Sequence, residues 1–425
     1  MSNSAGFRNI LASLKHRDYA IYTYAHMPGL IFMWAQRIGV GWVTWDLTHS
    51  PGWLGVIAMA DLLPSVFLAP IAGALADRVN VIKLLMISEA VLVIHGAVLW
   101  LLLVTGVLDI WILLALALLL GCNHSFGNAG RANVTPLIVP RADLAPAIAL
   151  NSICFNLARA TGPAVAGLII AGSGSAEWIF GLFAIGELIL LVALFFFRTP
   201  APPRMRQGGG FIGMVSDVRD GFGYVAAHAG IGPVLLLMIF GAVTSRPALE
   251  LLPGFADQVF ARGAEGLGWL GAAVGGGGIV SSFWLAWRGG TTGLAWIVIL
   301  HTMLMAIGLF VFGIVDNFWI ALPVLALVGF SLTVSGVGTQ TLLQWSVDPA
   351  MRGRVMSIFM LIFRGMPALG ALIMGITAEY FGLQAAVAAG GVVCAASCVW
   401  AYRRRAAMAE HLERSGTKPE GSAKP

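Results

Sequence analysis

Apolar residues run along this chain in stretches of roughly twenty, separated by short polar breaks. As an α-helix, which rises about 1.5 Å per residue, such a stretch spans the ~30 Å hydrocarbon core of a bilayer. Lipid offers no partner to unpaired backbone groups, so each stretch is predicted to be a helix. About twelve membrane helices are expected, over residues 19–47, 53–76, 81–105, 110–130, 147–172, 177–197, 231–253, 266–287, 294–315, 318–340, 355–380 and 383–402.

Composition supports a membrane location. Apolar residues make up 58% of the 425 positions and charged residues only 11%, which is far from the composition of a soluble domain. The fold class is therefore predicted to be an all-α membrane protein. The four cysteines fall inside predicted helices, where we expect them to act as small buried hydrophobes: Cys122, Cys154, Cys394 and Cys398.

Lysines and arginines indicate the orientation, because positively charged loops stay in the cytoplasm. With the N-terminus inside, most of the 25 basic residues fall on the cytoplasmic side, Arg131 among them, and only Arg262 falls outside. Both termini are then predicted to be cytoplasmic. The N-terminal segment lacks the pattern of a removable signal peptide, so the first helix is expected to remain. The net charge of +5 reflects this topology, and no nucleic-acid partner is expected.

A basic linker divides the chain into predicted six-helix bundles, residues 1–197 and residues 231–402. The linker, residues 198–230, begins RTPAPPRMRQGGG and continues with apolar residues at helical spacing. That spacing favours either a short amphipathic helix on the cytoplasmic membrane face or a plain connector, and it involves Phe211, Met214, Val215, Val218 and Phe222. The tail, residues 403–425, is expected to extend the last helix briefly and then to be disordered.

The two halves resemble each other. The stretch Asp143–Arg159 aligns with Asp348–Arg364, with identical residues at the Asp, Ala, Ser and Arg positions of DLAPAIALNSICFNLAR and DPAMRGRVMSIFMLIFR. Both copies begin the fifth predicted helix of their half. A duplicated six-helix unit explains this, and parallel repeats of that kind are a known transporter architecture.

The stretch GALADRVNVIKLL lies between the second and third predicted helices, and it resembles the loop signature of the major facilitator superfamily. Gly73, Leu75, Asp77, Arg78 and Leu85 match, whereas an asparagine replaces the usual glycine at position 80. The stretches SPGWLG, PRADLAPAIALNSICFNLARATGPAVAG and DGFGYV resemble the branch of enterobactin exporters and related drug-efflux proteins. The resemblance implies a twelve-helix exporter whose two bundles rock about a midplane site.

The charged loop has a physical use in such a transporter. A carboxylate at Asp77 can accept backbone N–H bonds at the start of a neighbouring helix, where the macrodipole is positive. If that helix is the one that begins near Arg352 and Arg354, then Gly73, Asp77 and Arg78 form part of a conformational latch. Otherwise the loop is a solvated tight turn.

Charged residues inside predicted helices are costly in lipid and usually face the protein interior. Arg37 and Asp61 lie at similar depth, so they form either a fixed ion pair or a pair that carries a coupling proton. Glu89 and Glu187 are further proton-coupling candidates. Arg246 and Glu250 stand four residues apart, which predicts a local pair.

Other polar residues are candidates for a substrate cavity. The repeat-related Arg159 and Arg364 either bind an anionic cargo or brace their own bundles. Asn123 and His124 either line a cavity or make ordinary helix-packing contacts.

The predicted function is secondary active transport, since the chain shows no nucleotide-binding domain, metal-ligand cluster or nucleophile with a base. We expect no enzyme activity and no cofactor. A monomer in the bacterial inner membrane, exporting a siderophore or drug-like molecule against protons, fits best. A lysophospholipid flippase, a solute importer and a ligand-binding membrane sensor remain alternatives.

Overall fold

A computed structural model describes residues 12–76, 78–198, 222–348 and 351–413. Within these ranges the chain is helical and contains no strand. Asp77, the linker residues Phe211 to Val218 and the tail beyond Glu413 lie outside the described residues, so the expectations for them stay predictions. Residues 222–227, at the end of the linker, are helical.

Contacts divide the chain into two compact units. Unit 1 comprises Met1–Gly208, Glu250–Gly275 and Asp316–Phe318, and unit 2 comprises Gly209–Leu249, Gly276–Val315 and Trp319–Pro425. Short segments that the sequence assigns to the second bundle therefore belong to unit 1 by their contacts.

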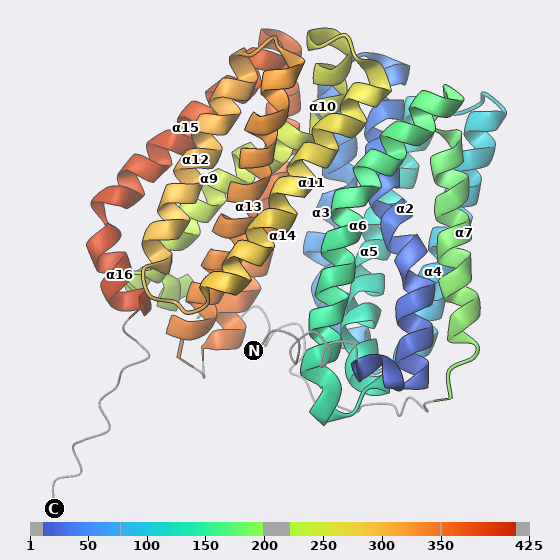
Figure 1. The fold of residues 1–425 in the computed structure, drawn as a ribbon, viewed down its shortest axis with the longest axis horizontal. Helices are drawn as coiled ribbons and strands as arrows, with labels where there is room; N and C mark the ends of the chain where they lie inside the picture. The colour runs from blue at the N-terminus through green and yellow to red at the C-terminus, as the bar shows by residue number, and fades with distance from the viewer. Residues whose placement is uncertain (1–11, 77, 199–221, 349–350, 414–425) are drawn as a thin grey trace, which may run out of the picture. The chain divides into compact units, whose positions relative to one another are not determined.

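In unit 1, the helices before the linker run side by side (Figure 1). They are η1 (Ala12–Lys15), α2 (Arg17–Thr48), α3 (Pro51–Ala76), α4 (Val81–Val104), α5 (Ile110–Ile138), η2 (Arg141–Asp143), α6 (Leu144–Ser173) and α7 (Glu177–Leu194). Unit 1 also contains α10 (Leu252–Gly254), the π-helical turn η3 (Phe255–Val259) and the first part of α11 (Gly263–Arg288).

Unit 2 holds the remaining long helices. They are α9 (Ile231–Glu250) up to residue 249, the rest of α11, α12 (Leu294–Ile314), α13 (Phe318–Ser346) from residue 319, α14 (Arg352–Phe381), α15 (Leu383–Arg403) and α16 (Arg405–Glu413). The twelve predicted spans all coincide with long helices of the two units.

Eleven of the described helices are long and apolar enough to cross a membrane. The twelfth predicted span coincides with α2, whose 32 residues are sufficient in length. Polar side chains such as Gln36 and Arg37 lower its mean hydropathy below that of the other spans. A membrane helix that carries such groups is expected to turn them toward protein, and Gln36 is indeed buried.

The predicted end of the fourth membrane helix is wrong. The sequence places that end at residue 130, but α5 continues to Ile138. Arg131 is therefore not in a cytoplasmic loop; it lies inside α5, and its side chain is only 15% exposed. Polar residues such as Asn133 are typical of loops, which is why the sequence predicts an earlier end. In the structure the Asn133 side chain donates to the Ala129 carbonyl of the same helix, 2.9 Å away.

An internal contact of each unit follows the predicted repeat. Asp143, at the start of α6, pairs with Lys15 and His16 just before α2, at 2.9 and 2.8 Å. Its counterpart Asp348, just before α14, accepts a hydrogen bond of 3.3 Å from Tyr224, which precedes α9. In each half, the same aspartate thus ties the start of the fifth span to the segment before the first.

Glycines allow close helix packing where the sequence has its GGGG run. A Cβ atom on Gly275 would lie 2.6 Å from the Ala160 Cα of α6. One on Gly277 would collide with the Ala326 carbonyl of α13. These glycines serve helix packing, as expected for small residues in membrane helices.

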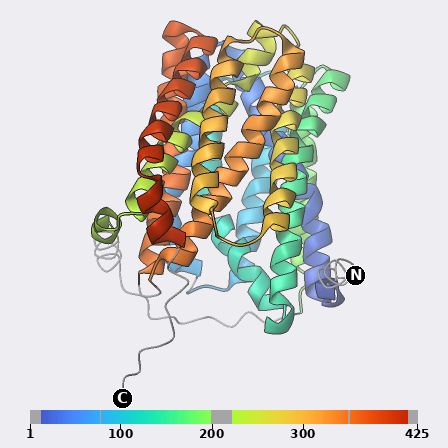
Figure 2. The same ribbon diagram turned by 60° about the vertical axis from the view of Figure 1, so that its left-hand side comes forward.

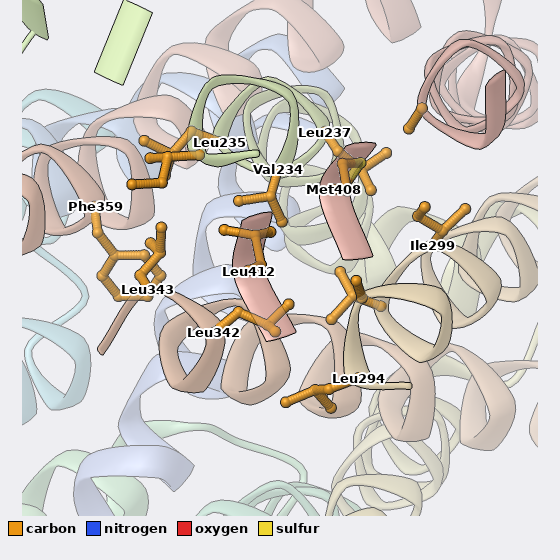
Figure 3. Packing of buried hydrophobic residues seen from close by; sticks show 14 of the residues in the cluster. Val234, Leu235, Leu237, Leu294, Ile299, Leu342, Leu343, Phe359, Met408 and Leu412 are labelled. Atoms are coloured by element: carbon orange, nitrogen blue, oxygen red, sulfur yellow. The ribbon is translucent and has the colours of Figure 1, made fainter. Parts of the chain in front are cut away.

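Unit 2 has a core that includes the tail helix. Met408 and Leu412 of α16 are fully buried, and they lie among Val234, Leu342 and Ile299 (Figure 3). Both ribbon views show α16 at the end of unit 2 where α12 begins (Figures 1 and 2). The predicted helical extension of the tail is confirmed, and it is a packed element.

Candidate functional site

Unit 1 contains two clusters of charged residues, one half-buried and one whose acids are fully buried. The first, called the Asp61 cluster, comprises Arg37 of α2, Asp61 of α3, His124 of α5 and Glu250. Asp61 lies 3.9 Å from Arg37 and 3.3 Å from His124. The Arg37 guanidinium also donates a short hydrogen bond to Glu250. Arg37 and Asp61 thus lie within ion-pair distance, as their similar depth predicts.

Close helix packing holds the Asp61 cluster in place. A Cβ on Gly121 would collide with the Asp61 carbonyl, so only glycine lets α5 approach α3 this closely. His95 of α4 lies nearby; its Nε2 is 3.2 Å from the Leu116 carbonyl, and its Nδ1 is 3.2 Å from the Gln36 amide nitrogen. The cluster is therefore built on rigid helices.

The second cluster, called the Glu89 cluster, comprises Glu89 of α4, Arg131 of α5 and Glu187 of α7. The Arg131 guanidinium donates to Glu89 Oε1 at 2.9 Å. Glu89 and Glu187 are 0% and 1% exposed. Gly29 of α2 packs so tightly here that a Cβ on it would lie 3.0 Å from the Glu187 carboxylate. Helices α2, α4, α5 and α7 all contribute to this site.

Hydrogen bonding in the Glu89 cluster is incomplete. Four buried polar atoms have no hydrogen-bond partner among the described residues: Ser88 Oγ, Glu89 Oε2, Arg131 Nε and Glu187 Oε2. An unpaired buried polar atom costs about 1–3 kcal/mol. Native proteins contain few such atoms, so their concentration in one cluster marks it as a candidate functional site.

A cavity of ≈ 470 Å³ borders the Glu89 cluster. It is lined by residues of α2, α5 and α6, and Arg131 contributes both to its wall and to the Glu89 cluster. Phe155, Leu30 and Met33 supply apolar surface, while Asn151 supplies an amide. The cavity suits a small molecule with both apolar and polar surface.

The cavity candidates Arg159, Arg364, Asn123 and His124 do not lie in this wall. His124 lies beside Asp61, and the Asn123 amide donates to the Ser88 carbonyl at 3.2 Å, which packs α5 on α4. Arg159 and Arg364 are half-buried, on α6 of unit 1 and α14 of unit 2. Their predicted roles in binding or bracing stay predictions.

Glu250 has a partner that the sequence does not predict, since its carboxylate accepts from Arg37. The Arg246 guanidinium lies over the Phe363 ring, 4.2 Å from its centroid. The local pair of Arg246 with Glu250 stays a prediction.

Only part of the predicted latch is described. Arg78 is exposed in the turn after α3, and Gly73 has open space around it. Arg352 and Arg354 lie in the first turn of α14 in unit 2. Asn80 has a role of its own, because its side chain accepts from the Ile82 and Lys83 backbone N–H groups and caps α4.

Arg131 is the functional candidate that sequence reasoning missed. Its signal was present in the helical spacing of Val134 and Ile138, which are both buried and stand four residues apart. Trp45 and Asp257 are a second unpredicted pair, in which the indole N–H donates to the carboxylate at 2.9 Å.

Comparison with known proteins places the chain among transporters. The profile of the family described as transmembrane secretion effector matches residues 9–421. The staphyloferrin A transporter of Staphylococcus aureus is 25% identical over 359 residues, which cover 83% of this chain and 88% of the relative. Enterobactin exporter EntS of Shigella boydii is 27% identical over 334 residues, 77% of each chain.

Solved structures show the same fold. A bacterial homologue of the human lysosomal transporter Spinster superposes with a TM-score of 0.68 at 14% identity, over 95% of this chain and 98% of that one. The nucleoside transporter NupG gives a TM-score of 0.67 at 13% identity, over 92% and 99% of the two chains.

Proposed function

We propose that this protein exports a small amphipathic molecule, a siderophore or a drug-like compound, by proton-coupled alternating access. The starting point is that the chain belongs to the transmembrane secretion effector family of the major facilitator superfamily. Family and fold are those of secondary transporters and not of enzymes. Both relatives are named after a siderophore, staphyloferrin A or enterobactin, so siderophores are the first cargo to test.

The observation that carries this proposal is the amphipathic cavity in contact with buried ionisable groups. The cavity of ≈ 470 Å³ has apolar and amide walls, and Arg131 joins it to Glu89. A transporter driven by protons needs a group that binds a proton close to the place where cargo binds. The candidates for that group are the carboxylates of both clusters: Asp61, Glu89 and Glu187, with Arg37 as the partner of Asp61.

Gating in this proposal uses the charged loop after α3. Asp77, between Gly73 and Arg78, is proposed to bind the start of α14 near Arg352 and Arg354 in one state and to release it in the other. The protein is proposed to act as a monomer in the bacterial inner membrane, with both termini in the cytoplasm. The basic residues support that orientation.

Flux in everted membrane vesicles tests the proposal. Vesicles with and without the protein are energised to an acid interior, and uptake of enterobactin or staphyloferrin A is measured. An exporter accumulates cargo inside such vesicles, and collapsing the pH gradient abolishes the accumulation.

Other outcomes identify the other functions. Uptake that occurs only in right-side-out vesicles indicates an importer. Movement of a fluorescent lysophospholipid alone indicates a flippase. Binding without any gradient-driven flux indicates a sensor, and each of these results contradicts export.

A further inference from the structure

Building on the proposed function, we propose that Glu187 and Glu89 share one bound proton, that this is the coupling proton, and that Arg131 controls its release into the cavity. Sequence reasoning pointed first to Asp61 for this role. The arrangement of partners around the two clusters points instead to the Glu89 cluster.

Charge balance is the first reason. Glu89 and Glu187 are two acids beside a single guanidinium, and Arg131 is bonded to Glu89. Among the described residues no ion pair within 4.0 Å is found for Glu187. With both carboxylates ionised, a fully buried negative charge would be left without a partner, which a low-dielectric interior strongly opposes.

The contact between the two acids is the second reason. Glu187 lies close enough to Glu89 for the two carboxyl groups to interact, and one oxygen of each, Glu89 Oε2 and Glu187 Oε2, has no hydrogen-bond partner among the described residues. Two carboxyl groups hydrogen-bond to each other only when one carries a proton, because two carboxylates offer acceptors and no donor. The structure therefore fits a protonated Glu187 donating to an ionised Glu89, with Arg131 neutralising Glu89.

The other groups facing this pair do not supply the missing charge. From α2, Tyr22 and His26 face Arg131, and Tyr22 also faces both acids. Ser88 precedes Glu89 on α4, and its Oγ has no partner among the described residues. Among the described residues His26 makes no ion pair within 4.0 Å with either acid. A tyrosine and a serine can donate a hydrogen bond to a carboxylate but do not balance its charge.

The Asp61 cluster differs in its partners. Asp61 has two basic side chains close by, His124 at 3.3 Å and Arg37 at 3.9 Å. Glu250 has the Arg37 guanidinium. Each acid there has a basic partner, so with a proton on His124 the cluster is balanced and Asp61 needs none.

Release of the proton follows from the position of Arg131. Arg131 both donates to Glu89 and lines the cavity, and its Nε has no hydrogen-bond partner among the described residues. When it moves to contact both carboxylates, the Glu187 O–H bond breaks, the proton passes to water in the cavity, and Arg131 stabilises the new carboxylate. Cargo in the cavity meets the same guanidinium, which couples the two events.

Infrared spectroscopy tests the proton directly. Purified full-length protein in lipid nanodiscs is titrated from neutral to alkaline pH, and the carbonyl stretch of protonated carboxylic acids is followed, with deuterium exchange as a check. We expect one such band in the wild type. Glu187→Gln and Glu89→Gln each remove it, because the remaining acid then pairs with Arg131. Asp61→Asn retains it.

Glu177→Gln is the matched control, since Glu177 begins the same helix and accepts instead from Ser175; this variant keeps the band. Absence of the band in the wild type, or its persistence in both Glu187→Gln and Glu89→Gln, overturns the inference. Because the band does not depend on transport, it separates this inference from the proposed function. If the band behaves as expected but the protein shows no proton-driven flux, the shared proton is supported and the proposed export function is contradicted.

Discussion

An arginine inside a membrane helix is stable where acids balance its charge, and two arginines of unit 1 each lie beside two acids. Arg37 contacts Asp61 and Glu250, and Arg131 contacts Glu89 with Glu187 behind it. The difference between the sites is His124, the additional base beside Asp61. At the scale of single residues, a protonated His124 balances Asp61, whereas among the described residues no base lies within 4.0 Å of Glu187.

The first prediction separates the two acids by their transport behaviour. In proteoliposomes, Glu187→Gln is expected to lose pH-driven accumulation and to keep energy-independent exchange of cargo, because the variant cannot release a proton but can still rock. Asp61→Asn is expected to change both activities together or neither, since Asp61 acts through a fixed ion pair. If Asp61→Asn lost only the pH-driven flux, Asp61 would be the residue that binds the coupling proton.

Helices approach each other closely where glycine faces backbone. A Cβ on Gly167 of α6 would lie 2.5 Å from the Gly268 Cα of α11, whereas one on Gly172 of the same helix would meet nothing within 4 Å. At the scale of the element, the sequence shows that glycines are numerous but not which of them are in contact. That information lies in the crossing of two helices distant in the chain.

A second prediction uses this pair of glycines. Gly167→Ala is expected to destabilise the protein by about 1–3 kcal/mol, since backbone must move to admit the methyl group. Gly172→Ala is expected to leave the melting temperature unchanged or slightly raised, because alanine is the better helix former. Thermal unfolding in detergent measures both, and equal melting temperatures would show that α6 and α11 do not pack as described.

The tail helix α16 packs its apolar side chains into the core of unit 2 and also makes polar contacts with it. Glu413 accepts the backbone N–H groups of Gly293 and Ala295 at 2.7 and 2.9 Å, which caps the start of α12. His411 lies against His228, with ring centroids 5.9 Å apart. The His228 Nδ1 in turn accepts from the backbone N–H groups of Gly230 and Ile231 at 3.2 Å each.

Acid is therefore expected to loosen α16. Burial, followed by the neighbouring His411, lowers the pKa of His228 below its ordinary value of 6.5. As the pH falls below 6.5, the unfolded state binds the proton first, so the stabilising contribution of neutral His228 is lost. Amide hydrogen exchange of residues 405–413, measured at constant intrinsic rate, should quicken below that pH. His228→Gln should reduce this pH dependence, and an unchanged dependence would contradict the role of His228.

Truncation provides the next prediction at this scale. Removal of the residues after Ser415 is expected to leave expression and flux nearly intact, because the charged tail is too polar to pack. Removal after Arg404 is expected to destabilise unit 2, because it deletes Met408, Leu412 and the Glu413 cap. Loss of function in the shorter deletion would show that the last residues are recognised or docked.

For the whole molecule, the sequence was sufficient to predict the fold. It was not sufficient to predict which charged residues pair with each other. Apolar stretches of membrane length are a local signal, and each of them became a helix. The Glu89 cluster joins α4, α5 and α7, so no local pattern contains it. The error at Arg131 had the same origin, because a buried arginine resembles a loop arginine until its acid partner is known.

The proposed latch at Asp77 can be tested by cysteine labelling. Asp77→Asn is expected to leave the protein inserted and to raise the labelling of single cysteines placed on the cytoplasmic side, because the proposed latch is weakened. The background carries Cys122→Ser and Cys154→Ser, since both native thiols are partly accessible. Unchanged labelling together with normal transport would exclude the latch.

Simultaneous measurement of cargo flux and proton flux tests proton-coupled export most directly. Purified protein in proteoliposomes is given an imposed pH gradient, enterobactin is supplied on one side, and an internal pH dye records protons while the cargo is counted. We expect cargo to move against its own gradient as protons move the opposite way. Glu187→Gln should stop both net movements, and Glu177→Gln should stop neither. Cargo that only equilibrates, with no proton movement and no effect of Glu187→Gln, would show that the protein is not a proton-coupled exporter.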